Sequence, residues 1–373
     1  MNELTYWITL YFIQGITLKR KNEIYVACYK SNPRISIVQL FEDSSIWSTL
    51  GLSFEEINLL VNAKAELANN SFLAESLLSQ GYDMIPMDSL DYSKTLKLNL
   101  QTISPSIIFT KGNKALLQEP AVAIVGSRSA DPLSLQFTSE VAKKCVAEGK
   151  IVVSGFAKGV DRMALDAALE AGGKSIIVLP QGIATFASGF KQYYKYITQG
   201  RLLVLSAFHP NAPWSVEFAM RRNPYIYGLA NEIYVAQSDD KGGTWSGVMD
   251  GLRKKRTIFV RMPEVGERNA NLLLIQKGAI AVDIKGNLVV LSSNDVLTQD
   301  EKDKKDRDDK IKQILESGGS ITSKYILEKL GLNWSDPKMK TYIRSLSFVE
   351  EYKSKGKIYF RLKGKIYQLE LEL

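Results

Sequence analysis

The chain has 373 residues, 45% of them hydrophobic and 24% charged, a composition typical of a globular protein with two or three domains. Its two cysteines lie far apart and it has a single histidine, so a disulfide framework, a cysteine zinc site and a two-histidine metal site are excluded. No apolar run reaches the roughly 18 residues of a transmembrane helix, and the apolar start of the chain lacks the basic residues of a signal peptide. We therefore expect a cytoplasmic protein that needs no metal or cofactor and contacts no membrane.

The net charge of +8 and the isoelectric point near 9.1 favour an anionic partner. Most of the excess lies near the C-terminus. Between residues 320 and 365, eleven lysines and arginines are opposed by four acidic residues, an excess of seven positive charges.

Residues 1–80 are expected to form a small helical domain. Apolar residues recur at a spacing near 3.6 between residues 54 and 80, and Gly81 ends this pattern. The runs YWITLYFI and IYVACY, within the first 30 residues, fit a helix or a strand equally well. A short extended segment containing prolines then leads into the next domain.

Residues 81–298 are expected to form an extended Rossmann-like domain. Runs rich in Val, Ile and Leu alternate with helical stretches, and this pattern predicts a doubly wound parallel sheet buried on both faces. The candidate strands are residues 122–125, 151–153, 175–179, 202–206, 232–236 and 257–261.

Residues 299–310 carry charges of both signs and are expected to be a linker or a solvated helical turn. Residues 311–373 then predict three helices and a hairpin with a Lys-Ser-Lys-Gly tip, which is the pattern of a winged helix-turn-helix. The DNA contacts expected from this domain are basic residues of the third helix and the wing: Lys338, Lys340, Arg344, Lys353, Lys355 and Lys357. The alternative is a module that binds protein.

Three motifs follow predicted parallel strands, where ligands bind in open α/β sheets. In the first, Gly126 allows close backbone approach, Ser127 offers a hydrogen bond and Arg128 can hold a phosphate through two bonds. The spacing is not that of the GxGxxG dinucleotide motif. The alternative is a plain turn with a solvated arginine.

The second motif stands between a predicted strand and helix. Ser154, Gly155 and Gly159 can form a tight loop around an anion, and Lys158 adds positive charge. Asp161 is expected to cap the helix that follows. The alternative is a capped turn that binds nothing.

The third motif consists of Lys241, Gly242, Gly243 and Thr244, which together can form an anion nest. Phosphoribohydrolases that activate plant hormones carry a similar PGGxGT element followed by a glutamate. That glutamate is absent here, which weakens the hydrolase interpretation.

Between these motifs, Phe218 stands close to Arg221, Arg222 and Asn223. Cations that track phosphates, interleaved with rings that stack on bases, are typical of single-stranded nucleic-acid binding. The alternative places the aromatic rings in the core and the arginines in solvent.

Six segments follow one another between residues 120 and 283: VAIVGSR, VVSGFAKGVDRMALDAAL, GGKSIIVLPQGI, RRNPYIYGLANEIYVAQ, GGTWSGV and NLLLIQKGAIAV. In this order they resemble the DNA-processing protein A (DprA/Smf) family. The resemblance implies an extended Rossmann domain, with helices of the SAM or helix-hairpin-helix type before it and a winged helix after it.

The family's Gly-Ser/Thr-Arg, Ser-Gly-x-Ala-x-Gly-x-Asp and Ser-Gly-Ser/Thr elements correspond to residues 126–128, 154–161 and 242–244. Its Arg-Asn-Arg corresponds to Arg222 and Asn223, followed here by Pro224. Leu165 stands where the family has a histidine, and Ala207 where it has a glutamate. The chain is therefore identified as a divergent member.

The resemblance implies a dimer that binds single-stranded DNA and hands it to a RecA-type recombinase during uptake of foreign DNA, or in a mobile-element or anti-phage variant of that role. We expect no catalysis. The strand would lie along the carboxyl edge of the sheet, with Arg128, Lys158 and Arg222 on phosphates and Phe218 stacked on a base. The alternative is a nucleotide sensor or nucleotide N-glycosidase on the same fold.

Overall fold

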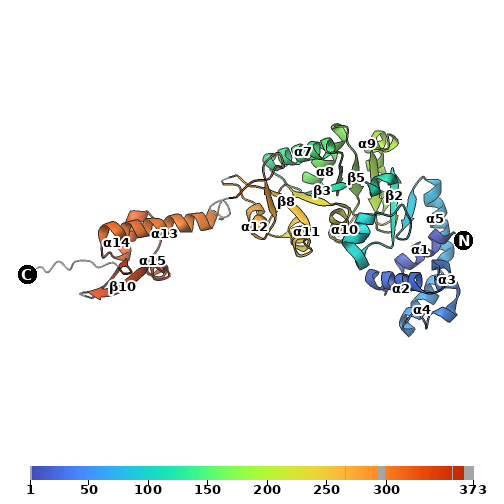
Figure 1. Ribbon diagram of the computed structural model, residues 1–373, viewed down its shortest axis with the longest axis horizontal. Coiled ribbons are helices and arrows are strands. Elements are labelled where there is room, and N and C mark those ends of the chain that lie inside the picture. The colour runs from blue at the N-terminus through green and yellow to red at the C-terminus, as the bar shows by residue number, and fades with distance from the viewer. Residues whose placement is uncertain (1, 265, 292–298, 355, 365–373) are drawn as a thin grey trace, which may run out of the picture. The chain divides into compact units, whose positions relative to one another are not determined.

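The computed structural model describes residues 2–264, 266–291, 299–354 and 356–364. The chain divides into two compact units, Met1–Leu291 and Ser292–Leu373, which are described separately (Figure 1).

A nine-stranded sheet, in the order β1-β2-β6-β5-β4-β3-β7-β8-β9, organises the first unit. The seven strands from β6 to β9 run parallel, whereas β1 pairs antiparallel with β2, and β2 antiparallel with β6. The strands are β1 Asp83–Pro86, β2 Ile107–Gly112, β3 Ala121–Val125, β4 Ile151–Ser154, β5 Ser175–Val178, β6 Leu202–Ser206, β7 Glu232–Val235, β8 Thr257–Arg261 and β9 Ile280–Val282.

The six strands predicted from apolar runs are confirmed, and the central ones, β3 to β6, are buried along their whole length. Burial on both faces explains why they consist of consecutive apolar residues rather than alternating ones. The three strands that were not predicted, β1, β2 and β9, lie at the two ends of the sheet.

Helices cover both faces of the sheet (Figure 1). Helices α7 and α8 pack on β3 and β4, and α9 packs on β6. Helix α10 crosses β3, β4 and β5 on the other face, beside α6 and α11. Their bounds are α6 Lys94–Leu100, α7 Pro132–Ala147, α8 Val160–Glu170, α9 Ala187–Thr198, α10 Val216–Leu229, α11 Gly242–Arg253 and α12 Asn271–Gln276, with short 3-10 turns η2 Gln101–Ile103, η3 Lys114–Gln118 and η4 Ile183–Thr185.

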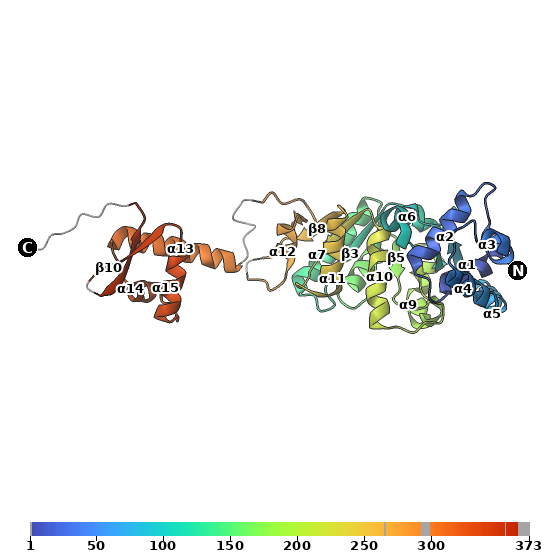
Figure 2. The same cartoon turned by 90° about the horizontal axis from the view of Figure 1, so that it is seen from below.

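The N-terminal helices gather beyond the edge of the sheet formed by β1 and β2 (Figures 1 and 2). Both ambiguous runs are helical. Trp7 and Leu10 of α1 belong to the same buried cluster as Ile107 of β2, so these helices share the core of the α/β part. The expected boundary at residue 80 therefore does not separate two compact units. The elements are α1 Glu3–Phe12, α2 Leu18–Lys30, α3 Ile37–Glu42, η1 Ser44–Ile46, α4 Phe54–Lys64 and α5 Leu67–Ser79.

The second unit has three helices followed by an antiparallel hairpin, the element order predicted for it: α13 Gln299–Gly318, α14 Ser323–Leu330, α15 Asp336–Arg344, β10 Val349–Ser354 and β11 Lys357–Leu362. Ile311, Met339 and Phe360 are fully buried in a core of its own. Of the two alternatives given for residues 299–310, a linker or a solvated helical turn, the structure has the helical one, because α13 runs through them. Charges of both signs along a helix support it through pairs such as Asp306–Lys310, at 2.8 Å.

Within the described ranges, no helix combines the length and the apolar character that crossing a membrane requires.

Candidate nucleic-acid interface

The three motifs meet where the strand order reverses. Strand β3 lies between β4 and β7, so the connections after β3 and β7 lead to opposite faces of the sheet and leave a crevice at the carboxyl ends of these strands. A cavity of about 430 Å³, called here the switch-point cavity, occupies this position. Gly126, Ser127 and Arg128 line it together with Lys241, Gly242, Gly243 and Thr244.

Backbone hydrogen bonds tie the three motifs to one another. The Ser127 N–H donates to the carbonyl of Gln237 at 3.0 Å, which joins the first motif to the segment between β7 and the third motif. The Val160 N–H donates to the carbonyl of Ser127 at 3.3 Å, which joins the second motif to the first. The loops therefore form one connected rim.

The glycines of this rim are required by close packing. A Cβ at Gly126 would lie 2.7 Å from Val160, and one at Gly159 would lie 2.5 Å from the carbonyl oxygen of Ser127. Gly159 also has φ +84, a conformation that other residues rarely adopt. These glycines let the first and second loops touch.

Arg128, Lys158 and Lys241 are the exposed cations of the rim. None of the three has a hydrogen-bond or ion-pair partner in the part of the chain that the structure describes. Their charges are therefore free to bind an anionic ligand.

The second loop already contains an anion, because Asp161 turns back into it. Its carboxylate is buried and accepts a hydrogen bond from the Ala157 N–H at 3.4 Å. Burial raises the pKa of Asp161, against the opposing charge of Arg222. The expected capping role is wrong: Gly159 is the N-cap of α8, and Asp161 lies within the first turn.

Arg222 is buried rather than presented to a phosphate. Its side chain is 3% exposed, donates to the carbonyl of Val178 at 2.7 Å and lies 4.0 Å from Asp161. Burial lowers the pKa of Arg222 to about 10. Its guanidinium fills the space beside Gly155 and supports the loop, while Arg222 also lines the switch-point cavity.

Two further residues of the second motif and its strand are also enclosed. The Ser154 hydroxyl donates to the carbonyl of Ile124 at 2.8 Å inside the sheet, and Gly155 is buried under the loop. Among the residues of the second motif that were predicted to bind an anion, Lys158 is the exposed one.

The other candidate residues of helix α10 differ in how exposed they are and in which residues they contact. Asn223 lines the switch-point cavity. Arg221 is exposed and paired with Glu217 at 3.4 Å, which reduces the charge it offers. Phe218 stacks on Phe208 with ring centroids 4.6 Å apart, so one of its faces is covered.

A neighbouring cavity of about 250 Å³ was not predicted. It adjoins the switch-point cavity at Arg128, Ala157 and Arg222, which line both. Its wall includes Trp214, whose side chain is 50% exposed. We call it the tryptophan cavity. The signal available in the sequence was a tryptophan just after Pro213, in a loop that follows a parallel strand.

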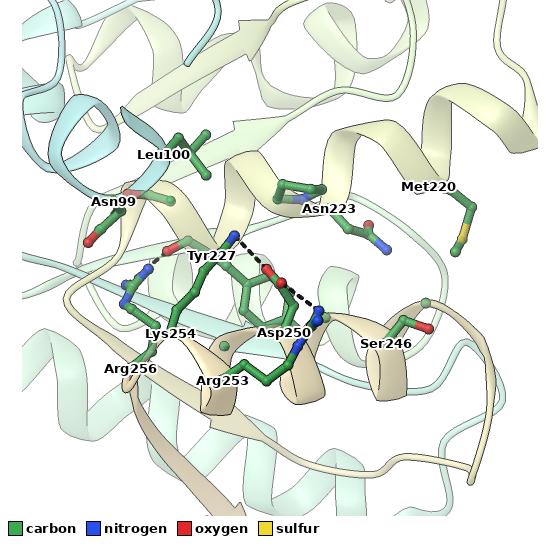
Figure 3. Close-up of a pocket in the computed structure, with 15 residues that line it drawn as sticks. Asn99, Leu100, Met220, Asn223, Tyr227, Ser246, Asp250, Arg253, Lys254 and Arg256 are labelled. Carbon is green, nitrogen blue, oxygen red and sulfur yellow. Dashed lines mark hydrogen bonds and ion pairs between the residues drawn. The ribbon is translucent and has the colours of Figure 1, made fainter. Parts of the chain in front are cut away.

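A third cavity, of about 240 Å³, lies between α10 and α11 and shares Met220, Asn223 and Gly243 with the switch-point cavity (Figure 3). Figure 3 shows Asp250 reaching both Arg253 and Lys254, at 2.9 and 2.7 Å. The cations of this third cavity are thus already neutralised in part. The third cavity therefore offers a weaker site for phosphate than the rim does.

The basic residues of the second unit fall into two groups. Lys340 and Arg344 are paired with Asp336 and Glu351, at 2.7 and 2.8 Å, and Lys338 lies 4.4 Å from the ring centroid of Trp334. The wing residues Lys353 and Lys357 are exposed and have no partner among the described residues. Lys355 lies outside the described residues.

The described ranges contain no cluster of three His, Cys, Asp or Glu side chains able to hold a metal ion.

Comparison with known proteins agrees with this architecture. A family model described as DNA recombination-mediator protein A matches residues 83–291, more than half of the chain. DNA processing protein DprA of Bacillus subtilis is 29% identical over 214 residues, which are 54% of this chain and 69% of the relative. DNA processing protein DprA of Streptococcus pneumoniae is 33% identical over 200 residues, 52% of this chain and 67% of the relative. These matches confirm the resemblance inferred from the ordered motifs.

The X-ray structure of DNA processing protein A from Streptococcus pneumoniae matches with a TM-score of 0.52 and 24% identity. The match covers 76% of this chain and 98% of that one. It shows that the two proteins share a fold.

Proposed function

Because the chain belongs to the DNA recombination-mediator protein A family, we propose that it binds single-stranded DNA along the carboxyl edge of its sheet and performs no catalysis there. Its role is to cover the strand and position it for another protein.

The observation that carries this proposal is the set of free cations on one connected rim. Arg128, Lys158 and Lys241 come from three different strand ends and have no partner among the described residues. Helix α11 adds a first turn without a side-chain cap, since its N-cap residue is Lys241, and its N–H groups favour an anion. A phosphodiester backbone supplies negative charges at regular intervals to such a rim.

Apolar side chains beside these cations favour a single strand over a duplex. Val216 and Met220 line the switch-point cavity while being 65% and 48% exposed. The bases of a single strand have free faces that can cover such surface, whereas a duplex presents mainly its phosphates.

The partners follow from the family resemblance. We propose that the protein acts as a homodimer and delivers the strand to a RecA-type recombinase, during uptake of foreign DNA or in a mobile-element or defence setting. The winged-helix-like unit would add contacts through its wing lysines.

The test is fluorescence anisotropy of a labelled 20-nucleotide strand, repeated at several salt concentrations. We expect Arg128→Ala to weaken binding to all sequences alike and to reduce the salt slope by about 0.7, the value for a single phosphate on a single strand. Lys195→Ala is the matched control, because Lys195 is exposed in the last turn of α9, which leads to the opposite edge of the sheet. Wild-type protein that fails to bind the strand at low salt would overturn the proposal.

The second candidate is a nucleotide sensor or N-glycosidase, favoured by the volume of the switch-point cavity, which lies in the range of small-ligand sites. Asp161 is the carboxylate of the second loop, but it is buried and Arg222 lies beside it. Thermal-shift measurements with mononucleotides and cyclic dinucleotides distinguish the two functions. Stabilisation by a nucleotide, together with no binding of the 20-nucleotide strand, would favour this candidate.

A further inference from the structure

Trp214 is a half-exposed aromatic side chain in the loop between β6 and α10, at the carboxyl edge of the sheet. It is 50% exposed, and no ring contact, hydrogen bond or ion pair involves its side chain among the described residues. Burying the exposed part of this large apolar ring against a ligand would be favourable. The ring therefore stands ready for a planar ligand.

The loop that carries Trp214 is held in place on both sides. The Gly182 N–H donates to the carbonyl of Ala212 at 2.9 Å, and the Ala184 N–H donates to the carbonyl of Pro210 at 3.0 Å. Directly after the tryptophan, the Ser215 hydroxyl caps α10 by accepting from the Phe218 N–H at 3.0 Å. These contacts fix the backbone on both sides of Trp214, so little backbone entropy would be lost on binding.

The tryptophan cavity combines an apolar wall with cations at its rim. Leu179, Pro180 and Phe186 line it together with Trp214. Arg128 and Lys158 line the same cavity and are exposed and unpaired among the described residues. This pairing of an aromatic face with nearby cations fits a base and the phosphate next to it.

We propose that the tryptophan cavity holds one unpaired base of the single strand, stacked on Trp214, while the adjoining phosphate contacts Arg128 and Lys158. This inference rests on the proposed function and adds a base-binding site to it. Such stacking accepts any base, because every base presents a π face.

The geometry assigns this role to Trp214 rather than to Phe218, the residue expected from the sequence. Phe218 has one face against Phe208 and is not among the residues lining the tryptophan cavity. Trp214 is half exposed, and the cations Arg128 and Lys158 line the same cavity.

The test compares two labelled ligands of equal length, oligothymidylate of 20 nucleotides and a 20-unit abasic strand that has phosphates but no bases. Trp214→Ala is expected to weaken binding of oligothymidylate roughly 5- to 150-fold, the loss typical of removing one stacking ring. Binding of the abasic strand is expected to change less than twofold. Trp214→Phe should restore most of the affinity for oligothymidylate.

Two control variants make the result interpretable. Tyr194→Ala removes a ring that is 67% exposed on α9 and lines neither cavity, and it should leave both affinities unchanged. Arg128→Ala should weaken both ligands. Thermal unfolding verifies that each variant is folded.

If Trp214→Ala leaves the affinity for oligothymidylate unchanged while Arg128→Ala reduces it, the base site is refuted and DNA binding stands. The same conclusion follows if Trp214→Ala weakens both ligands equally, because the ring would then support the backbone contact alone. If the wild-type protein binds neither ligand, the proposed function itself fails.

Discussion

At the scale of single residues, Gly155 and Arg222 depend on each other. The guanidinium of Arg222 lies in the space where a side chain at position 155 would begin, and it donates to the carbonyl of Val178 below the loop. Because the arginine is buried beside Asp161, it has no alternative position at low cost. The buried Arg222 side chain therefore determines the shape of the second loop.

We predict that Gly155→Ala destabilises the protein by about 1–3 kcal/mol, the usual cost of overpacking a filled site. Ser129→Ala serves as the matched control, because Ser129 is exposed on the neighbouring loop and its substitution should stay within about 0.5 kcal/mol. Urea denaturation gives both free energies of unfolding. Equal stability of the two variants would show that Arg222 can move aside.

The sequence predicts that the three motifs share one edge of the sheet, but it does not separate exposed from buried cations. Arg128 and Lys158 are exposed, whereas Arg222 is buried. The helical period gives a signal for this, because Ala219, Arg222 and Ile226 form one buried stripe of α10. Trp214 escapes prediction because a loop has no periodicity from which exposure can be inferred.

At the scale of elements, the hairpin of the second unit and its third helix differ in how much charge they leave free. Helix α15 carries Lys340 and Arg344, both engaged by carboxylates, whereas the strands of the hairpin carry Lys353 and Lys357 without partners among the described residues. Surface ion pairs are weak, but they still compete with phosphate for the same cation. The hairpin is therefore the stronger candidate for contact with DNA.

We predict that Lys353→Ala combined with Lys357→Ala lowers the affinity for a 20-base-pair duplex and reduces its salt slope by about 0.9 for each phosphate that is no longer neutralised. Lys340→Ala, the matched control, should have a smaller effect because its ammonium is paired with Asp336. Anisotropy titrations over a range of salt measure the slopes. An unchanged slope in the double variant would favour the alternative of a protein-binding module.

Most elements could be predicted from the sequence, and the exceptions have local causes. Apolar runs identify β3 to β8 because these strands are wholly or mostly buried, whereas β9 has three residues and is too short to give a pattern. The charged start of α13 resembles a linker because it has few apolar residues, although opposite charges four apart support a helix.

At the scale of the whole molecule, the buried clusters of the two compact units are separate: two lie in the first unit and one in the second. The core of the first unit extends from α1 to β9, and that of the second consists of Ile311, Phe360 and the residues around them. We therefore expect the N-terminal helices to unfold together with the sheet. The second unit relies on its own small core, which makes it the more sensitive to a single core substitution.

We predict that Phe360→Ala removes about 3–5 kcal/mol from the second unit, because its ring is fully buried, and leaves unfolding of the first unit unchanged. Phe54→Ala is the control, since Phe54 is 80% exposed. Differential scanning calorimetry of the full chain resolves the transitions. A common shift of every transition would contradict the independence of the two cores.

The turns that line the two adjoining cavities come from four neighbouring strands, β5, β4, β3 and β7. Three spacings of about 4.8 Å between these strands make an edge of about 14 Å. At about 3.4 Å of stacked strand per charge, that edge accommodates about four nucleotides. Under the proposed function, one copy of the protein would therefore cover about four nucleotides of a single strand at this edge.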